Sequence, residues 1–343
     1  MVAPSTALAA DSYVPIVKAK RAELDALRET SHSRLLPLLD VREPAKTVAA
    51  LTKSWPHTAD AIWLHCHNVE DEDAPVFAAT VDNVFQSLRG SVAAVPVVTS
   101  AEEPTLLAAV AAIASADGRG AVLRVDVEDV LDTSIDVEAD IDATLDGLGL
   151  SASDIDLVLD GGALESSPTV AAAAASQAMA RLPYLSDWRN VVVAFGTFPE
   201  QVGSLVAKGS VAAFPRTDAA AWATVNASSP RVIVFGDYAL GSASLAESPG
   251  FSPIPNIKYA SGPHWYIHRA NRKTQPSPQY IQLAKDVVAA SYFEGAGASP
   301  GDARINAVAT GASGPGNATT HLQAASARHF HVVLTRLATL GVP

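Results

Sequence analysis

Short apolar segments alternate with helical stretches along the first 235 residues of this chain. The apolar segments are rich in β-branched residues and predict strands at 14–17, 35–39, 61–64, 95–98, 121–125, 155–159, 191–195 and 232–235. They lack the alternation of polar and apolar residues that marks a half-exposed strand, so they fit strands buried on both faces of a parallel sheet. The pattern predicts an α/β fold.

Helical patterns fill the intervals between these strands. They are expected at 21–30, 74–88, 103–114, after Ser167-Pro168, at 200–206 and at 218–225. Eight strands that alternate with helices favour a (β/α)8 barrel over an open doubly wound sheet. The Gly-rich turn of a dinucleotide-binding sheet is also absent after the first strand, where the sequence reads Lys18-Ala19-Lys20-Arg21.

After Phe235 the sequence becomes rich in Gly, Pro and aromatic residues, which predicts a layer of strands and helices appended to the barrel. A strand is expected there at 264–268 and helices at 278–294 and 319–340; a short extra strand at 212–214 is expected earlier, within the barrel segment. We therefore divide the chain into an N-terminal extension (1–12), a TIM-like barrel (13–260) and a C-terminal layer (261–343).

Composition narrows the partners and the compartment. The net charge of −12 over 343 residues argues against general nucleic-acid binding, which rewards clustered Lys and Arg. The single cysteine, Cys66, rules out an intramolecular disulfide and is compatible with a reducing cytoplasm. No apolar run reaches the ~20 residues of a membrane helix, and no signal peptide is recognisable at the start.

In a barrel of this kind, functional groups gather at the carboxyl ends of the strands. Basic side chains at or near those ends predict a pocket for an anion such as a phosphate or carboxylate, with Tyr238 beside it. The basic residues are Lys18, Lys20, Arg124 and Arg269. In the alternative, Lys20 is solvated and Lys18 forms an ion pair with Asp40 or Asp237 across the barrel.

Carboxylates at the strand ends are the candidates for acid–base or hydrolytic chemistry. Asp126 and Asp160 follow consecutive strands, and a close pair of carboxylates would separate their pKa values. Asp237 follows the eighth strand and is a third catalytic candidate. In the alternative, Asp126 and Asp160 only pair with Arg124 or Lys18.

His65 and His67 lie two apart on one face of the third strand and are candidate metal ligands. An acidic run, 70–73, follows them and could supply a carboxylate. The same run is also typical of a solvated loop.

Three short motifs resemble the Beta protein family of phages and bacteria. They are the stretch from Tyr13 to Lys20 with Pro37-Leu38-Leu39-Asp40-Val41, then Gly301-Asp302-Ala303-Arg304-Ile305, and Gly316-Asn317 ahead of a His-containing final helix. The final helix reads His329-Phe330-His331, whereas the family tends to carry an adjacent His pair. The resemblance implies a phage-related protein, often of unassigned activity, and supplies no reaction.

Three functions follow from the sequence. The first is binding of an anionic ligand at the barrel mouth, with hydrolysis as an optional activity. The second is a non-catalytic assembly or scaffold component of a phage or antiviral defence system, with a protein partner or an oligomer. The third is a metal-dependent hydrolase at His65 and His67. No organic cofactor is expected, and whether the protein is an enzyme stays open.

Overall fold

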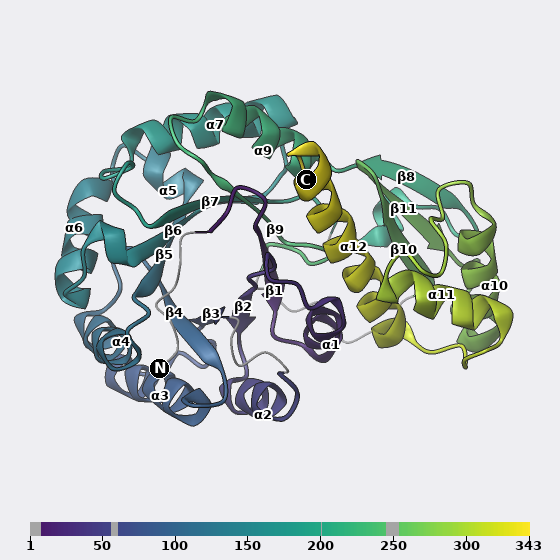
Figure 1. The fold of residues 1–343 in the computed structure, drawn as a ribbon, viewed down its shortest axis with the longest axis horizontal. Coiled ribbons are helices and arrows are strands. Elements are labelled where there is room, and N and C mark those ends of the chain that lie inside the picture. The colour runs from purple at the N-terminus through teal and green to yellow at the C-terminus, as the bar shows by residue number, and fades with distance from the viewer. Residues whose placement is uncertain (1–7, 56–60, 200, 245–253) are drawn as a thin grey trace.

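The computed structural model describes residues 8–55, 61–199, 201–244 and 254–343, and its centre is a closed barrel of parallel strands (Figure 1). The strand order is β1-β2-β3-β4-β5-β6-β7-β9. The strands are β1 (Tyr13–Lys18), β2 (Leu38–Val41), β3 (Ala61–Cys66), β4 (Ala93–Thr99), β5 (Ala121–Asp126), β6 (Ile155–Ala163), β7 (Asn190–Gly196) and β9 (Val234–Asp237). The predicted eight-stranded barrel is confirmed.

Helices follow the strands and form a ring around the barrel (Figure 1). They are α1 (Arg21–Thr30), α2 (Pro44–Ser54), α3 (Ala74–Leu88), α4 (Pro104–Asp117), α5 (Val127–Leu131), α6 (Val137–Leu148), α7 (Pro168–Arg181), α8 (Val202–Leu205) and α9 (Thr217–Ser228), with a 3-10 turn at Ala152–Asp154. At α7 the sequence signal for a helix start is confirmed: the Ser167 side chain accepts from the Val170 N–H, and Pro168 occupies the first turn.

Alternate residues of each strand face opposite sides of the barrel wall. On β1, Val14 and Ile16 pack inside the barrel with Leu38 and Trp63. The intervening Tyr13 packs in the larger core between the barrel and its helices. Both faces of the wall are therefore apolar along most of each strand, which is why the strands read as continuous apolar runs.

The register brings the polar ends of neighbouring strands to one level. Lys18 pairs with Asp40, and Asp40 pairs with His65. Farther round the barrel, Asp126 pairs with Asp160. Because parallel strands all end on the same side, these residues lie at the same end of the barrel.

A three-stranded antiparallel sheet lies beside the barrel, in the order β10-β11-β8 (Figure 1). Its strands are β8 (Val211–Pro215), β10 (Asn256–Ser261) and β11 (His264–Arg269), and α10 (Pro276–Ala289) and α11 (Pro300–Thr310) belong to the same layer. The short strands expected at 212–214 and 264–268 are confirmed.

The strand pairing of the added sheet crosses the expected division of the chain at residue 260. β8 lies within the predicted barrel segment but pairs with β11, and β10 begins before the boundary. The reason is that β8 leaves the barrel between β7 and β9 and supplies an edge strand to the added sheet. Of the predicted N-terminal extension, residues 1–7 lie outside the described part of the chain.

The long helix α12 (Ala318–Leu340) lies between the barrel and the added sheet (Figure 1). It packs against α1 and β10, and its Phe330 and Val333 join the main core. α12 thus fills the place between α9 and α1 and completes the helical ring. None of the described helices combines the length and apolar character that crossing a membrane would need.

Candidate functional site

A cavity of about 410 Å³ opens at the carboxyl ends of the barrel strands. We call it the mouth cavity. Most of its lining residues have polar side chains, and they come from the ends of β3, β4, β5 and β6, from the segments that follow these strands and from the segment after β9. The polar lining side chains are His65, His67, Asn68, Thr99, Glu102, Arg124, Asp126, Asp160 and Tyr238.

Strand alternation turns these side chains toward the cavity. His65 and His67 flank Cys66 on and just after β3, and Arg124 and Asp126 flank Val125 on β5. Both pairs line the mouth cavity, as their spacing of two residues predicts. Val125 instead packs in the core outside the barrel.

Arg124 is the centre of a buried network. Its Nε donates to Asp160 Oδ2 at 2.8 Å, and its Nη2 donates to Tyr238 Oη at 2.7 Å and lies 2.7 Å from Asp160 Oδ2. Its Nη1 lies 2.9 Å from Asp40 Oδ1 and 3.1 Å from His65 Nδ1. The guanidinium has five N–H donors in a fixed fork; four of them donate hydrogen bonds in these contacts, and Nη2 also lies within ion-pair distance of Asp160.

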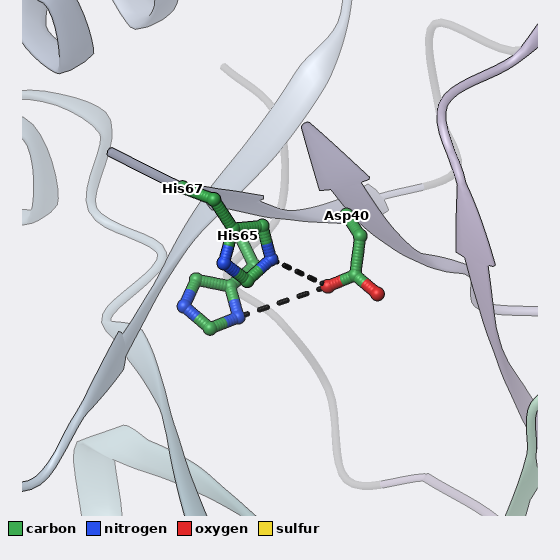
Figure 2. Close-up of side chains that lie close together, drawn as sticks. All are labelled: Asp40, His65 and His67. Atoms are coloured by element: carbon green, nitrogen blue, oxygen red, sulfur yellow. Dashed lines mark hydrogen bonds and ion pairs between the residues drawn. The ribbon is translucent and has the colours of Figure 1, made fainter. Parts of the chain in front are cut away.

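Asp40 lies at the other end of this network, next to His65 of β3 and to His67, which follows β3 (Figure 2). His67 Nε2 donates to Asp40 Oδ1 at 2.8 Å, and His65 Nδ1 lies 3.8 Å from the same oxygen. Burial alone would raise the pKa of Asp40, but the His67 hydrogen bond and the charge of Arg124 outweigh it and lower the pKa to about 2. Burial lowers the pKa of His65 well below its usual value, so that ring is neutral at pH 7.

The geometry also bears on the predicted metal site. One ligand atom from each of Asp40, His65 and His67 lies within 4.8 Å of the others, which is compact enough for one ion. However, Arg124 Nη1 already contacts Asp40 and His65, so a divalent cation there would face a guanidinium at close range. Metal binding at these histidines stays a prediction, which metal analysis of the purified protein would test.

Asp126 differs from the other carboxylates of the cavity. Within the described part of the chain, no group hydrogen-bonds to its side chain, whereas Asp160 accepts from Arg124, Tyr238 and the Gly162 N–H. Burial, and then the negative charge of Asp160, raise the pKa of Asp126 to about 6. The predicted pair of neighbouring carboxylates is present, with one engaged by Arg124 and the other facing the cavity.

The other predicted anion-binding residues lie elsewhere. Lys18 borders a separate cavity of about 20 Å³, and its Nζ donates to the Ser244 carbonyl at 2.8 Å. Lys20 is exposed at the start of α1. Arg269 donates to the carbonyl oxygens of Gly203 and Val206. None of these three residues lines the mouth cavity.

Asp237 faces away from the barrel interior. Its carboxylate accepts from Tyr13 Oη at 2.5 Å and pairs with His329 Nε2 of α12 at 2.7 Å, and Arg216 Nη2 lies 3.6 Å away. These groups are buried between the barrel and the added layer. Of the three predicted catalytic carboxylates, Asp126 and Asp160 meet at the mouth, and Asp237 does not.

The candidate site residues expected from the sequence include neither Asp40 nor Glu102. Asp40 comes two positions after the inward-facing Leu38, and that spacing places it inside the barrel at the end of β2. Glu102 lies in the loop after β4, where its Oε1 accepts from the Thr99 hydroxyl at 2.6 Å. No spacing rule would have found it.

Comparisons with solved structures find distant similarities. The apo homocysteine methyltransferase of Escherichia coli is 15% identical, with a TM-score of 0.38, over 66% of this chain and 90% of that chain. A type I 3-dehydroquinate dehydratase from Clostridium difficile is 8% identical, with a TM-score of 0.39, over 65% of this chain and 83% of that chain. At these scores, neither similarity supports an inference about chemistry.

Sequence comparison gives a clearer result. No curated protein matches the chain. The Beta protein family, by contrast, matches residues 13–335, which takes in the barrel, the added sheet and nearly all of α12. The chain belongs to the Beta protein family.

Proposed function

We propose that the mouth cavity is an active site in which Asp126 transfers protons to and from a small polar organic molecule. The observation that carries this proposal is the Asp126 carboxylate, which has a pKa of about 6 and faces a cavity of about 410 Å³. An acid–base group works best when its pKa lies near the working pH, because both of its protonation states are then accessible.

The neighbouring residues fit supporting roles. Arg124 and Tyr238 hold the Asp160 carboxylate, and that negative charge helps to keep the pKa of Asp126 raised. Asp40 holds the His67 ring through Nε2. That contact fixes the tautomer in which Nδ1 can accept a proton, so His67 is a second proton-transfer group of the proposal.

The anionic ligand expected from the sequence has weaker support. Arg124 already donates four hydrogen bonds to protein groups, and Lys18, Lys20 and Arg269 lie outside the mouth cavity. Anion binding therefore stays a prediction, which binding measurements with an anionic compound would test. The scaffold function stays a prediction, to be tested by the size of the protein in solution with and without candidate protein partners.

The proposed function is tested with hydrolysis and binding assays on Asp126→Asn. We would assay p-nitrophenyl esters, phosphates and glycosides across the pH range around 6, and screen a library of polar metabolites for thermal stabilisation. Asp129→Asn is the matched control, because Asp129 is exposed on α5.

We expect at least one compound class to be turned over, with an inflection in the rate near pH 6. Asp126→Asn should lose about 10²- to 10⁴-fold in rate, and Asp129→Asn should retain the activity. Equal rates in the wild type and in Asp126→Asn would contradict the proposal. So would the absence of both turnover and stabilisation across the whole set.

A further inference from the structure

The mouth cavity holds unused hydrogen-bond acceptors. No described residue donates to either oxygen of the Asp126 side chain. Glu102 accepts from the N–H and the hydroxyl of Thr99 through Oε1, and no described residue hydrogen-bonds to its Oε2. Two carboxylates on the cavity wall therefore have capacity for donors that the protein does not supply.

Few donors of the cavity lining lack a protein acceptor. Arg124, the lining's Arg side chain, donates four hydrogen bonds to protein groups. The Asn68 amide donates one N–H to the Glu72 carbonyl, and no described residue accepts the other. His65 supplies a donor from a mostly buried side chain. Its Nδ1 faces a guanidinium N–H and acts as an acceptor, so the ring proton resides on Nε2.

The Nε2–H of His65 is a hydrogen-bond donor that a ligand in the cavity could use. The His65 side chain is 8% exposed and lines the cavity, and no described residue accepts from its Nε2. The side chain is mostly buried, but Nε2 itself is reached from the cavity, so water or a ligand there accepts its proton. The site therefore offers this donor on the same cavity as two carboxylates.

The cavity wall carries net negative charge, which also favours a ligand that donates hydrogen bonds. Arg124 lies between two carboxylates, Asp40 and Asp160, which together exceed its single positive charge. Glu102 and Asp126 add negative charge on the same cavity. A cation placed among them is attracted, and an anion is repelled, in a partly buried space where charges are weakly screened.

We propose that the ligand of the mouth cavity is a small amino alcohol, whose ammonium group pairs with Asp126 and Glu102 and whose oxygen accepts from His65 Nε2. This inference rests on the proposed function and adds the class of its substrate. It replaces the anionic ligand expected from the sequence with a cationic one.

Three probes on one skeleton separate the possibilities by charge. They are trans-4-aminocyclohexanol, 1,4-cyclohexanediol and 4-hydroxycyclohexanecarboxylate, which are cationic, neutral and anionic at neutral pH. Binding would be measured by calorimetry, and by amide chemical-shift changes that locate the probe. The proteins are the wild type, Asp126→Asn and Glu102→Gln, with Asp129→Asn and Glu103→Gln as exposed controls.

We expect the amino alcohol to bind at least about tenfold more tightly than the diol, because a charged hydrogen bond contributes roughly that much. Each of Asp126→Asn and Glu102→Gln should weaken it about tenfold, and the controls should not. The affinity of the wild type should also fall as the pH drops below 6, because Asp126 then becomes protonated.

Tightest binding by the hydroxy acid, or equal binding of all three probes, would overturn the cationic assignment. So would failure of all three to bind. Each of these outcomes leaves the proposed function to its own assay, because turnover of another compound class that depends on Asp126 would still establish an acid–base site. If the amino alcohol does not bind most tightly and no turnover depends on Asp126, both proposals are contradicted.

Discussion

Arg124 is a buried cation whose partners are two buried carboxylates, Asp40 and Asp160. Removal of one member of a buried ionic cluster leaves the rest without compensation. We expect Arg124→Met to lower the free energy of unfolding by about 3–5 kcal/mol, measured by urea denaturation at pH 7.

The control for this change is Arg21→Met. The Arg21 side chain is 87% exposed, and its ion pair with Asp25 spans 3.5 Å, so the change should cost less than about 1 kcal/mol. Equal stability of the two variants would show that the Arg124 network is not what holds the mouth together.

Asp126 gives the protein a pH-dependent weakness. Its pKa is about 6 in the folded protein and about 3.9 in an unfolded chain, so the folded state holds the proton more tightly. The stability from this group is present below about pH 4 and is lost as the pH rises to about 6. Asp126→Asn should remove this loss.

The measurement is the urea midpoint of the wild type and of Asp126→Asn at several pH values from about 4 to 7. The urea midpoint of Asp126→Asn should rise relative to that of the wild type as the pH rises. Asp40 acts in the opposite direction: its pKa of about 2 adds stability that is lost only as the pH falls below about 4. Parallel curves over the whole range would contradict the raised pKa of Asp126.

The residues of the site could be predicted as far as strand alternation reaches. His65, His67, Arg124 and Asp126 share faces with inward-facing neighbours, and that spacing is visible in the sequence. The same rule excludes Asp237, which comes one position after the inward Gly236, although its place after a strand made it a candidate. Neither the closure of Arg124 on Asp40 nor the role of Glu102 follows from spacing, because both depend on contacts across the barrel or within a loop.

At the scale of elements, apolar runs located all eight barrel strands, but the predicted helices did not include α2, α6 and α11. α11 illustrates the reason. It begins at Pro300-Gly301-Asp302, residues typical of a turn, yet Asp302 is buried and accepts from Tyr259 and Arg328. Long-range contacts that the local sequence does not encode stabilise this helix.

Gly301 allows α11 to approach α12 closely. A Cβ at this position would overlap the Ala324 carbonyl oxygen and come within 2.9 Å of Arg328 Cβ. We expect Gly301→Ala to destabilise the protein by about 1–3 kcal/mol in urea denaturation, despite the higher helix propensity of Ala.

Gly297→Ala is the matched control, because no atom lies within 4 Å of its added Cβ. That variant should keep the stability of the wild type within about 0.5 kcal/mol. A neutral Gly301→Ala would mean that the two helices pack less closely than described.

At the scale of the molecule, α12 joins the barrel and the added sheet into one cooperative unit. Its Phe330 and Val333 pack in the barrel core, while Ala325 and Val332 pack with Trp265 of β11. His329 adds a buried pair with Asp237 at the end of β9. Because one helix contributes to both cores, neither layer can open without cost to the other.

Hydrogen exchange tests this coupling. Amides of β4 in the barrel and of β11 in the added sheet should reach the same opening free energy, which equals the global free energy of unfolding. Markedly easier opening of β11 would define a separate folding unit and contradict the role given to α12.

The acid–base role of Asp126 is tested most directly by NMR titration of its carboxyl carbon, with the signal assigned by its loss in Asp126→Asn. We expect a midpoint near pH 6 in the free protein and a lower midpoint when trans-4-aminocyclohexanol is bound, because a nearby cation stabilises the carboxylate. A midpoint near 4, unmoved by any compound that binds the protein, would contradict an acid–base site at the mouth of the barrel.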